Sequence, residues 1–220
     1  MLRAIVWKEF KEVLGDRSLA TSALSVLPLL GMLSAATAKH MPISVESLMF
    51  YLPPCLGILV GFSLSASFVK EKREGTVEAL LCTPLTLREL WLGKVMGLTT
   101  VSHVVSTVST LTLVGLKGYV ISVEMAVYLI VVVPAVVASA IGLLGFLYYV
   151  LGMKEVKVLN YMVFLALFAM LRLAVKRLAL STALAWWGMG MMLALSLAIL
   201  GITYYLVGGL SSERIITTIS

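Results

Sequence analysis

The sequence contains few side chains that could carry out chemistry. Asp16 is the only aspartate, and His103 is one of only two histidines. No H-E-x-x-H zinc motif and no G-x-S-x-G nucleophile elbow occurs. Gly93 and Lys94 lack the upstream glycine and the following hydroxyl that a phosphate-binding P-loop requires. We therefore expect no catalytic residues, no metal site and no cofactor bound by this chain, and an intramembrane enzyme is the weaker alternative.

A run of charged residues at 70–74 (KEKRE) is the most distinctive feature of the chain. Consecutive ionised side chains are excluded from hydrocarbon, so this run must lie between two apolar stretches. After it, Gly75 ends one helix and Thr76 can cap another by accepting a backbone N–H bond. Glu78 stands in the first turn, where the helix dipole favours a negative charge. The following residues give this short helix an apolar face and a proline stop: Val77, Leu80, Leu81 and Pro84.

A second helix start follows immediately. Thr86 and Glu89 have the spacing of a capping box, and Leu85 and Leu90 stand at the two positions of a hydrophobic staple. The next helix is therefore predicted to begin at about Leu87. The stretch 70–89 is predicted to hold a short amphipathic helix between two spans, which would suit the docking of another protein.

This stretch resembles the first cytoplasmic loop of ABC-2-type transporter permeases. The resemblance rests on the charged run, the G-T-x-E-x-L-L sequence at 75–81, the T-P turn at 83–84 and the L-G-K sequence at 92–94. In that family the helix in this loop transmits the movements of an ATPase subunit to the membrane spans. The resemblance implies that coupling to the ATPase falls on these residues: Glu71, Glu74, Gly75, Thr76, Val77, Glu78, Leu80, Leu81, Thr83, Pro84, Leu85 and Thr86.

The resemblance also implies partners. An ABC ATPase subunit would bind ATP and Mg, and a second permease copy or a related permease would complete the pathway. The residues Trp7–Phe10 are similar to the interfacial helix near the start of such permeases, and 212–214 (SER) weakly resemble their ending.

The composition indicates a membrane protein. Hydrophobic residues make up 60% of the chain and charged residues 13%, with a mean hydropathy of +1.05, which is outside the range of soluble domains. The 220 residues suit one all-α transmembrane domain of about six spans. The net charge of +6 indicates contact with anionic lipid and not nucleic acid.

The apolar stretches predict the boundaries of the spans. Residues 1–17 are expected to form an amphipathic interfacial helix, or else a simple extension of the first span. Pro53–Pro54 should bend or break the second span, and Pro134 should kink the fourth. A re-entrant external region is expected at about 172–187. The six spans are predicted at about 18–38, 48–69, 90–116, 125–151, 158–174 and 188–210.

Some residues within the spans are candidates for contacts. Gly57, Gly61 and Ser65 form a ladder of small side chains that permits close helix contact, either as a dimer seam or as packing within one subunit. His103 is a candidate for substrate contact, with a hydrogen-bonded structural role as the alternative. Three further residues are candidates for contact with either substrate or lipid headgroups: Arg172, Lys176 and Arg177.

The distribution of basic residues predicts the topology. Twelve basic residues lie in the proposed cytoplasmic segments and five in the external ones, which favours both termini on the cytoplasmic side of the cell membrane. Together with the resemblance, this predicts a multi-pass permease subunit of an ATP-driven exporter. A permease similar to the haem exporter of cytochrome c maturation, and a membrane scaffold or sensor subunit, are the alternatives.

Overall fold

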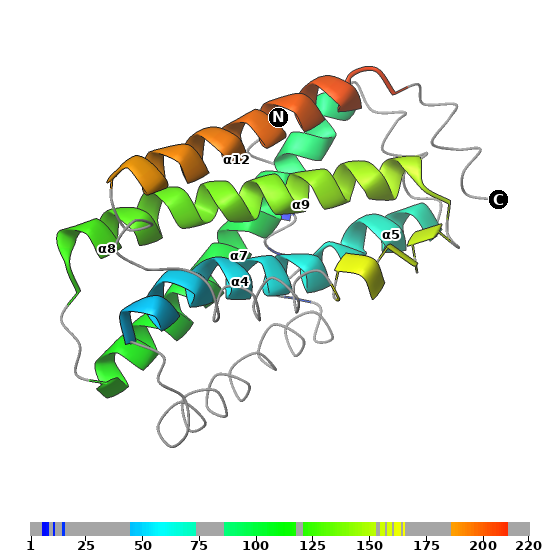
Figure 1. The fold of residues 1–220 in the computed structure, drawn as a ribbon. Helices are drawn as coiled ribbons and strands as arrows, with labels where there is room; N and C mark the ends of the chain where they lie inside the picture. The colour runs from blue at the N-terminus through cyan, green and yellow to red at the C-terminus, as the bar shows by residue number, and fades with distance from the viewer. Residues whose placement is uncertain are drawn as a thin grey trace.

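The structure is a bundle of helices. It is a computed structural model, and it describes residues 6–8, 11, 15, 45–73, 86–117, 121–152, 155, 156, 158, 159, 161–163, 165 and 186–210. Every secondary-structure element in this part of the chain is helical, in agreement with the predicted all-α class. In Figure 1, α12 (Trp186–Val207), α9 (Val133–Val150) and α4 (Val45–Leu64) lie side by side, and α7 (Leu87–Lys117) crosses behind them.

The described residues contain three helices that are long and apolar enough to cross a membrane: 50–71, 123–150 and 186–207. They correspond to the second, fourth and sixth predicted spans. The 31-residue helix α7 corresponds to the third and begins at Leu87, as predicted. Its many serines and threonines make it less apolar than the other three. The predicted first span and most of the fifth lie outside the described residues, as do most of the interfacial helix and the tail.

The second span continues further than its apolar residues suggest. A turn at Ser65 separates α4 from α5 (Ala66–Arg73), and the Ser65 hydroxyl donates a hydrogen bond to the carbonyl of Gly61 at 2.7 Å. The span was predicted to end at Val69, but α5 reaches Arg73. The first residues of the charged run therefore form the last turn of a helix and not a loop. Glu71 can lie in this turn because it pairs with the buried Lys94.

The two prolines were predicted to bend or break this span; α4 runs through both of them, so the break does not occur. Pro54 has no N–H to donate to the carbonyl of Phe50 four residues earlier. The hydroxyl of Tyr128 donates to that carbonyl at 2.8 Å instead. The rings of Tyr128 and Phe50 also stack, with their centroids 4.7 Å apart. A neighbouring helix thus supplies the hydrogen bond that proline removes.

The fourth span consists of α8 (Val123–Val127), the π-helical turn η1 (Tyr128–Val132) and α9. Ser122 caps its start, where its hydroxyl accepts a bond from the backbone N–H of Met125 at 3.3 Å. At the end of η1 the N–H of Val133 donates to the carbonyl of Tyr128, five residues back. The predicted distortion at Pro134 therefore takes the form of a wider turn just before it, which accommodates a residue without an N–H.

The gap between the predicted fourth and fifth spans, 152–157, is partly helical. Residues 155 and 156 are already helical, and the Glu155 carboxylate accepts a bond from the N–H of Gly152 at 3.1 Å. This side chain caps the next helix, so the chain turns back within a few residues.

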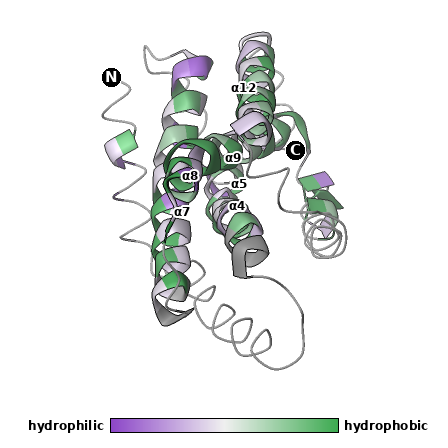
Figure 2. Cartoon of the chain, turned by 60° about the vertical axis from the view of Figure 1, so that its left-hand side comes forward, coloured by the Kyte–Doolittle hydropathy of each residue, from purple (hydrophilic) through white to green (hydrophobic). Residues whose placement is uncertain are grey.

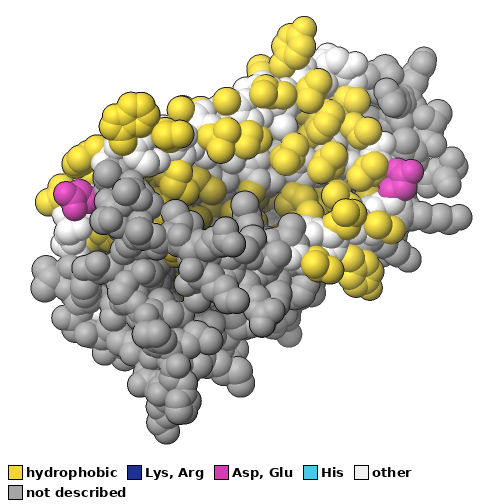
Figure 3. All heavy atoms as spheres, viewed as in Figure 1, with side chains coloured by type: hydrophobic (Ala, Val, Ile, Leu, Met, Phe, Trp, Pro, Cys, Tyr) yellow, Lys and Arg dark blue, Asp and Glu magenta, His cyan; other side chains and the backbone are white. Residues whose placement is uncertain are grey.

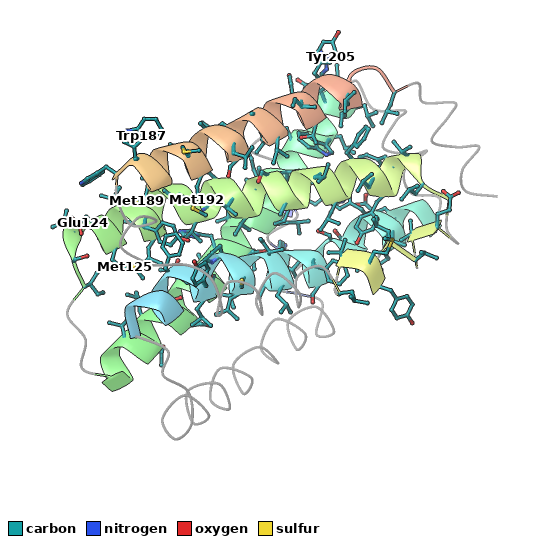
Figure 4. All side chains as sticks on the ribbon, in the orientation of Figure 1. Glu124, Met125, Trp187, Met189, Met192 and Tyr205 are labelled. Atoms are coloured by element: carbon teal, nitrogen blue, oxygen red, sulfur yellow. The ribbon has the colours of Figure 1, made fainter. Side chains whose placement is uncertain are left out.

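The last helix begins earlier than predicted and has two different faces. Trp186 and Trp187 belong to α12 and not to the re-entrant region. Met189 is buried, whereas Trp187 and Tyr205 are exposed and point away from the bundle (Figure 4). Hydrophobic residues predominate along α9 and α12 (Figure 2), and hydrophobic side chains make up most of the coloured surface over these helices in Figure 3. The outward face of α12 is therefore suited to contact lipid.

Candidate coupling site

Four helices meet at the end of the bundle from which the predicted docking loop leaves. The end of α5 and the start of α7 flank residues 74–85, and the ends of α9 and α12 lie on the same side (Figure 1). The rings of Phe68 and Tyr149 are 5.5 Å apart and join α5 to α9 at this end. Ten predicted coupling residues lie outside the described residues: Glu74, Gly75, Thr76, Val77, Glu78, Leu80, Leu81, Thr83, Pro84 and Leu85. The described part of the site consists of Glu71, Thr86 and their neighbours.

Glu71 forms a buried ion pair across the base of the loop. Its Oε1 lies 2.8 Å from the Nζ of Lys94, and the two side chains are 9% and 1% exposed. The same ammonium lies 5.1 Å from the centroid of the Phe68 ring, a cation–π contact. The Nζ of Lys8 lies 3.7 Å from the same carboxylate oxygen. Glu71 therefore ties α5 to α7 and to the N-terminal segment.

The start of α7 is fixed by the capping box that the sequence predicts. The Thr86 N–H donates to Oε2 of Glu89 at 3.0 Å, and the Glu89 N–H donates to Oγ1 of Thr86 at 3.3 Å. The Thr86 hydroxyl also donates to that carboxylate at 2.9 Å. The bonds from the Thr86 N–H and hydroxyl hold the pKa of Glu89 below its ordinary value. An ionised Glu89 thus closes the first turn of α7 at the point where the loop ends.

Two further residues of α7 connect this start to the last two helices. The guanidinium carbon of Arg88 lies 5.4 Å from the centroid of the Tyr204 ring in α12. The Trp91 indole N–H donates to the carbonyl of Gly142 in α9 at 3.2 Å. Sequence reasoning missed both roles. Arg88 and Tyr204 are far apart in the sequence, as are Trp91 and Gly142, and no local pattern relates the members of either pair.

The small-residue ladder packs inside the chain. A Cβ on Gly61 would lie 2.6 Å from Cδ1 of Ile141 in α9 and 3.3 Å from Oγ of Ser102 in α7. One on Gly57 would overlap the side chain of Val137. These glycines let three helices approach one another. The third member, Ser65, is fully buried and bonds back to its own helix, as described above.

The hydroxyls of α7 mostly bond to their own helix. Such bonds run to the carbonyl four residues earlier from Thr100, Ser102, Thr110 and Thr112. Ser106 is different, because its hydroxyl donates to the carbonyl of Pro53 in α4 at 2.5 Å.

His103 is half-buried, and its Nδ1 lies 3.5 Å from the Thr107 hydroxyl of the same helix. The structure therefore gives it a polar neighbour within α7. The three other candidates for substrate or lipid contact, Arg172, Lys176 and Arg177, lie outside the described residues. Among the residues that the structure does describe, no group of three or more His, Cys, Asp or Glu could hold a metal ion.

Comparison with known proteins returns no relative. No protein-family model matches the chain, and no curated protein matches it in a sequence search. The resemblance to ABC-2-type permeases therefore rests on the sequence alone, chiefly on the motif residues of 71–94. What the chain does is accordingly a matter for proposal.

Proposed function

We propose that this chain is the membrane subunit of an ABC-2-type transporter, an exporter driven by a separate ABC ATPase subunit. The observation that carries the proposal is a loop whose sequence resembles that of the family and whose two ends are held by specific side-chain contacts. Glu71 and Lys94 pair beneath the loop, and the Thr86–Glu89 box fixes its exit. A docking helix needs ends held in this way, because a force applied to a flexible tether would be lost.

In this proposal the ATPase pushes on the short helix predicted at 76–84. Separating α5 from α7 would leave the charges of Glu71 and Lys94 buried apart, which is strongly unfavourable. A displacement of the loop should therefore move α5 and α7 together, as one unit. That movement would open and close a pathway formed with a second copy of the chain or with a related permease.

The proposal includes six spans and both termini on the side of the ATPase. Three apolar helices and α7 account for four spans, and the stretches 18–38 and 158–174 would supply the other two. The ends of α9 and α12 lie at the same end of the bundle as the loop, which supports a common cytoplasmic face.

The test is reconstitution with the ATPase that co-purifies with this chain. In lipid nanodiscs we expect the wild-type chain to alter the rate of Mg-ATP hydrolysis by that subunit. Glu78→Ala and the double variant Leu80→Ser/Leu81→Ser should insert normally but lose ATPase binding or the change in rate. Glu124→Ala is the matched control, because Glu124 also stands in the first turn of a helix, at the opposite end of the bundle. Unchanged binding and rate in the loop variants would refute the docking assignment.

A further inference from the structure

The contact between Arg88 and the end of α12 links the proposed docking loop to a third helix, in addition to α5 and α7. We infer that Arg88 is a positioning residue that passes movements of the docking loop to α12, the last span. This inference rests on the proposed function, since it concerns the route by which that same loop acts on the bundle. The route adds α12 to the two helices that are joined covalently to the loop.

Arg88 is two residues past Thr86, at the end of the loop, and its side chain reaches across to α12. Its guanidinium lies over the Tyr204 ring and directly against the backbone of Gly208, in the turn that ends α12. The Nε of Arg88 is buried and has no hydrogen-bond partner among the described residues. The side chain is therefore held in place by the ring and by the shape of the turn.

Tyr204 also contacts a second side chain of α7. The rings of Trp91 and Tyr204 have their centroids 6.4 Å apart. Positions 88 and 91 are three residues apart, so they lie on the same face of α7. Two side chains of one helix thus hold one side chain of another, and a rotation of the start of α7 would displace Tyr204. Trp91 is in turn anchored to α9 through its bond to Gly142, which keeps this face of α7 oriented.

Gly208 makes the close approach of Arg88 feasible. A Cβ added at Gly208 would overlap Nε and Nη2 of Arg88. The backbone of Gly208 is not in the left-handed region, so alanine is compatible with its conformation. The three atoms nearest to that Cβ all belong to Arg88, so Gly208→Ala should act first on Arg88. Among the described residues, a Cβ at Gly209 would meet only the Leu206 carbonyl, at 3.5 Å, which is an ordinary contact.

These features define a set of matched variants: Arg88→Ala, Gly208→Ala, the double variant, and Gly209→Ala as control. Each is reconstituted in nanodiscs with the co-purifying ATPase. Bound ATPase, thermal unfolding and the change in Mg-ATP hydrolysis caused by the membrane subunit are measured. We expect Arg88→Ala and Gly208→Ala each to reduce that change by about fivefold, the lower range of typical couplings between sites. ATPase binding should stay at the wild-type level.

The double variant separates transmission from general damage. If Gly208→Ala acts by displacing Arg88, it should have no further effect once Arg88 is alanine, and Gly209→Ala should behave as wild type. Two independent reductions that multiply in the double variant, or a wild-type response of Arg88→Ala, would overturn the inference and leave the docking loop intact. A wild-type chain that binds no ATPase would instead refute the proposed function, and the inference with it.

Discussion

Glu71 differs from the other described carboxylates in its surroundings. Glu89, Glu124 and Glu155 are exposed, whereas the side chain of Glu71 is 9% exposed and pairs with an ammonium that is buried even more deeply. A buried pair of this kind adds little net stability compared with an apolar pair, but removal of one partner is costly. We therefore expect the pair to act on register, by favouring the alignment of α5 against α7 in which the two charges meet.

This leads to a prediction at the residue scale. Glu71→Ala should destabilise the chain by about 3–5 kcal/mol, because the Lys94 ammonium would stay buried without this carboxylate. The double variant Glu71→Leu/Lys94→Met should recover most of that loss, since apolar side chains would replace both charges. Unfolding in detergent, followed by circular dichroism, measures the differences.

Lys8→Ala is the control for this series. The Lys8 side chain is 52% exposed, so removing its longer contact with Glu71 should cost less than about 1 kcal/mol. A double variant as unstable as Glu71→Ala would contradict the assignment, and so would a Lys8→Ala variant that is equally damaging.

At the residue scale, local chemistry was predictable and distant contacts were not. The Thr86–Glu89 box was predicted because its two members are three residues apart and belong to one turn. Glu71 and Lys94 both fall within the recognised motif, yet their pairing depends on how α5 packs against α7. The contact of Arg88 with Gly208 joins residues far apart in sequence, and no periodicity indicates it.

At the scale of elements, the helices α4 and η1–α9 support each other. The prolines in α4 weaken it, and Tyr128 compensates with its hydroxyl and with its ring. We predict that Tyr128→Phe, which keeps the stacked ring but leaves the Phe50 carbonyl without this donor, costs about 1–3 kcal/mol. Unfolding measurements in detergent test this directly.

A second substitution makes this prediction sharper. Pro54→Ala restores an N–H that can donate to the Phe50 carbonyl within α4, so Tyr128→Phe should cost much less in that background. Tyr161→Phe is the control, because the Tyr161 side chain is 76% exposed. An equal cost of Tyr128→Phe with and without Pro54 would show that the hydroxyl does not replace the missing helical bond.

The sequence pattern within a helix does not reveal which of its glycines contact another helix. Gly57 and Gly61 pack against neighbouring helices, whereas no atom of the described residues lies within 4 Å of a Cβ placed on Gly190 or Gly201 in α12. In the sequence, glycines of both kinds simply interrupt apolar helices. Which of them contacts another helix depends on the arrangement of the bundle, and a pattern within one helix does not contain that information.

At the scale of the whole molecule, the helices of the described residues can be compared with the spans predicted from hydropathy. The predicted second, third, fourth and sixth spans each contain a helix of the structure. The differences occur at the ends: α5 extends to Arg73, where Glu71 pairs with the buried Lys94, and α12 begins at Trp186. Hydropathy detects which residues avoid water, but not which charged residues are neutralised by a neighbour.

The proposed function places the docking loop on the cytoplasmic side, and the start of α8 lies at the opposite end of the bundle (Figure 4). In a Cys55→Ala background, Cys82 of the docking loop should resist a membrane-impermeant thiol reagent in intact cells. It should react after permeabilisation. Mass spectrometry of the purified chain gives the labelled fraction.

Ser122→Cys, combined with Cys55→Ala and Cys82→Ala, is the matched control. Ser122 is exposed and caps the opposite end of the bundle, so it should react in intact cells. Labelling of Cys82 from outside, with Ser122→Cys protected, would reverse the orientation of the entire bundle and remove the ATPase from the docking loop.

The π-helical turn has a consequence for how the fourth span presents its side chains. A bond spanning five residues fits one more residue into the turn than an α-helix would hold. Each α-helical residue advances by about 100° around the axis. A helical wheel drawn without interruption through 123–150 therefore misplaces Glu124 and Met125 by about that angle relative to α9. Removing a single residue from Tyr128–Val132 would rotate α8 about the helix axis relative to α9 and turn the buried Met125 out of the bundle.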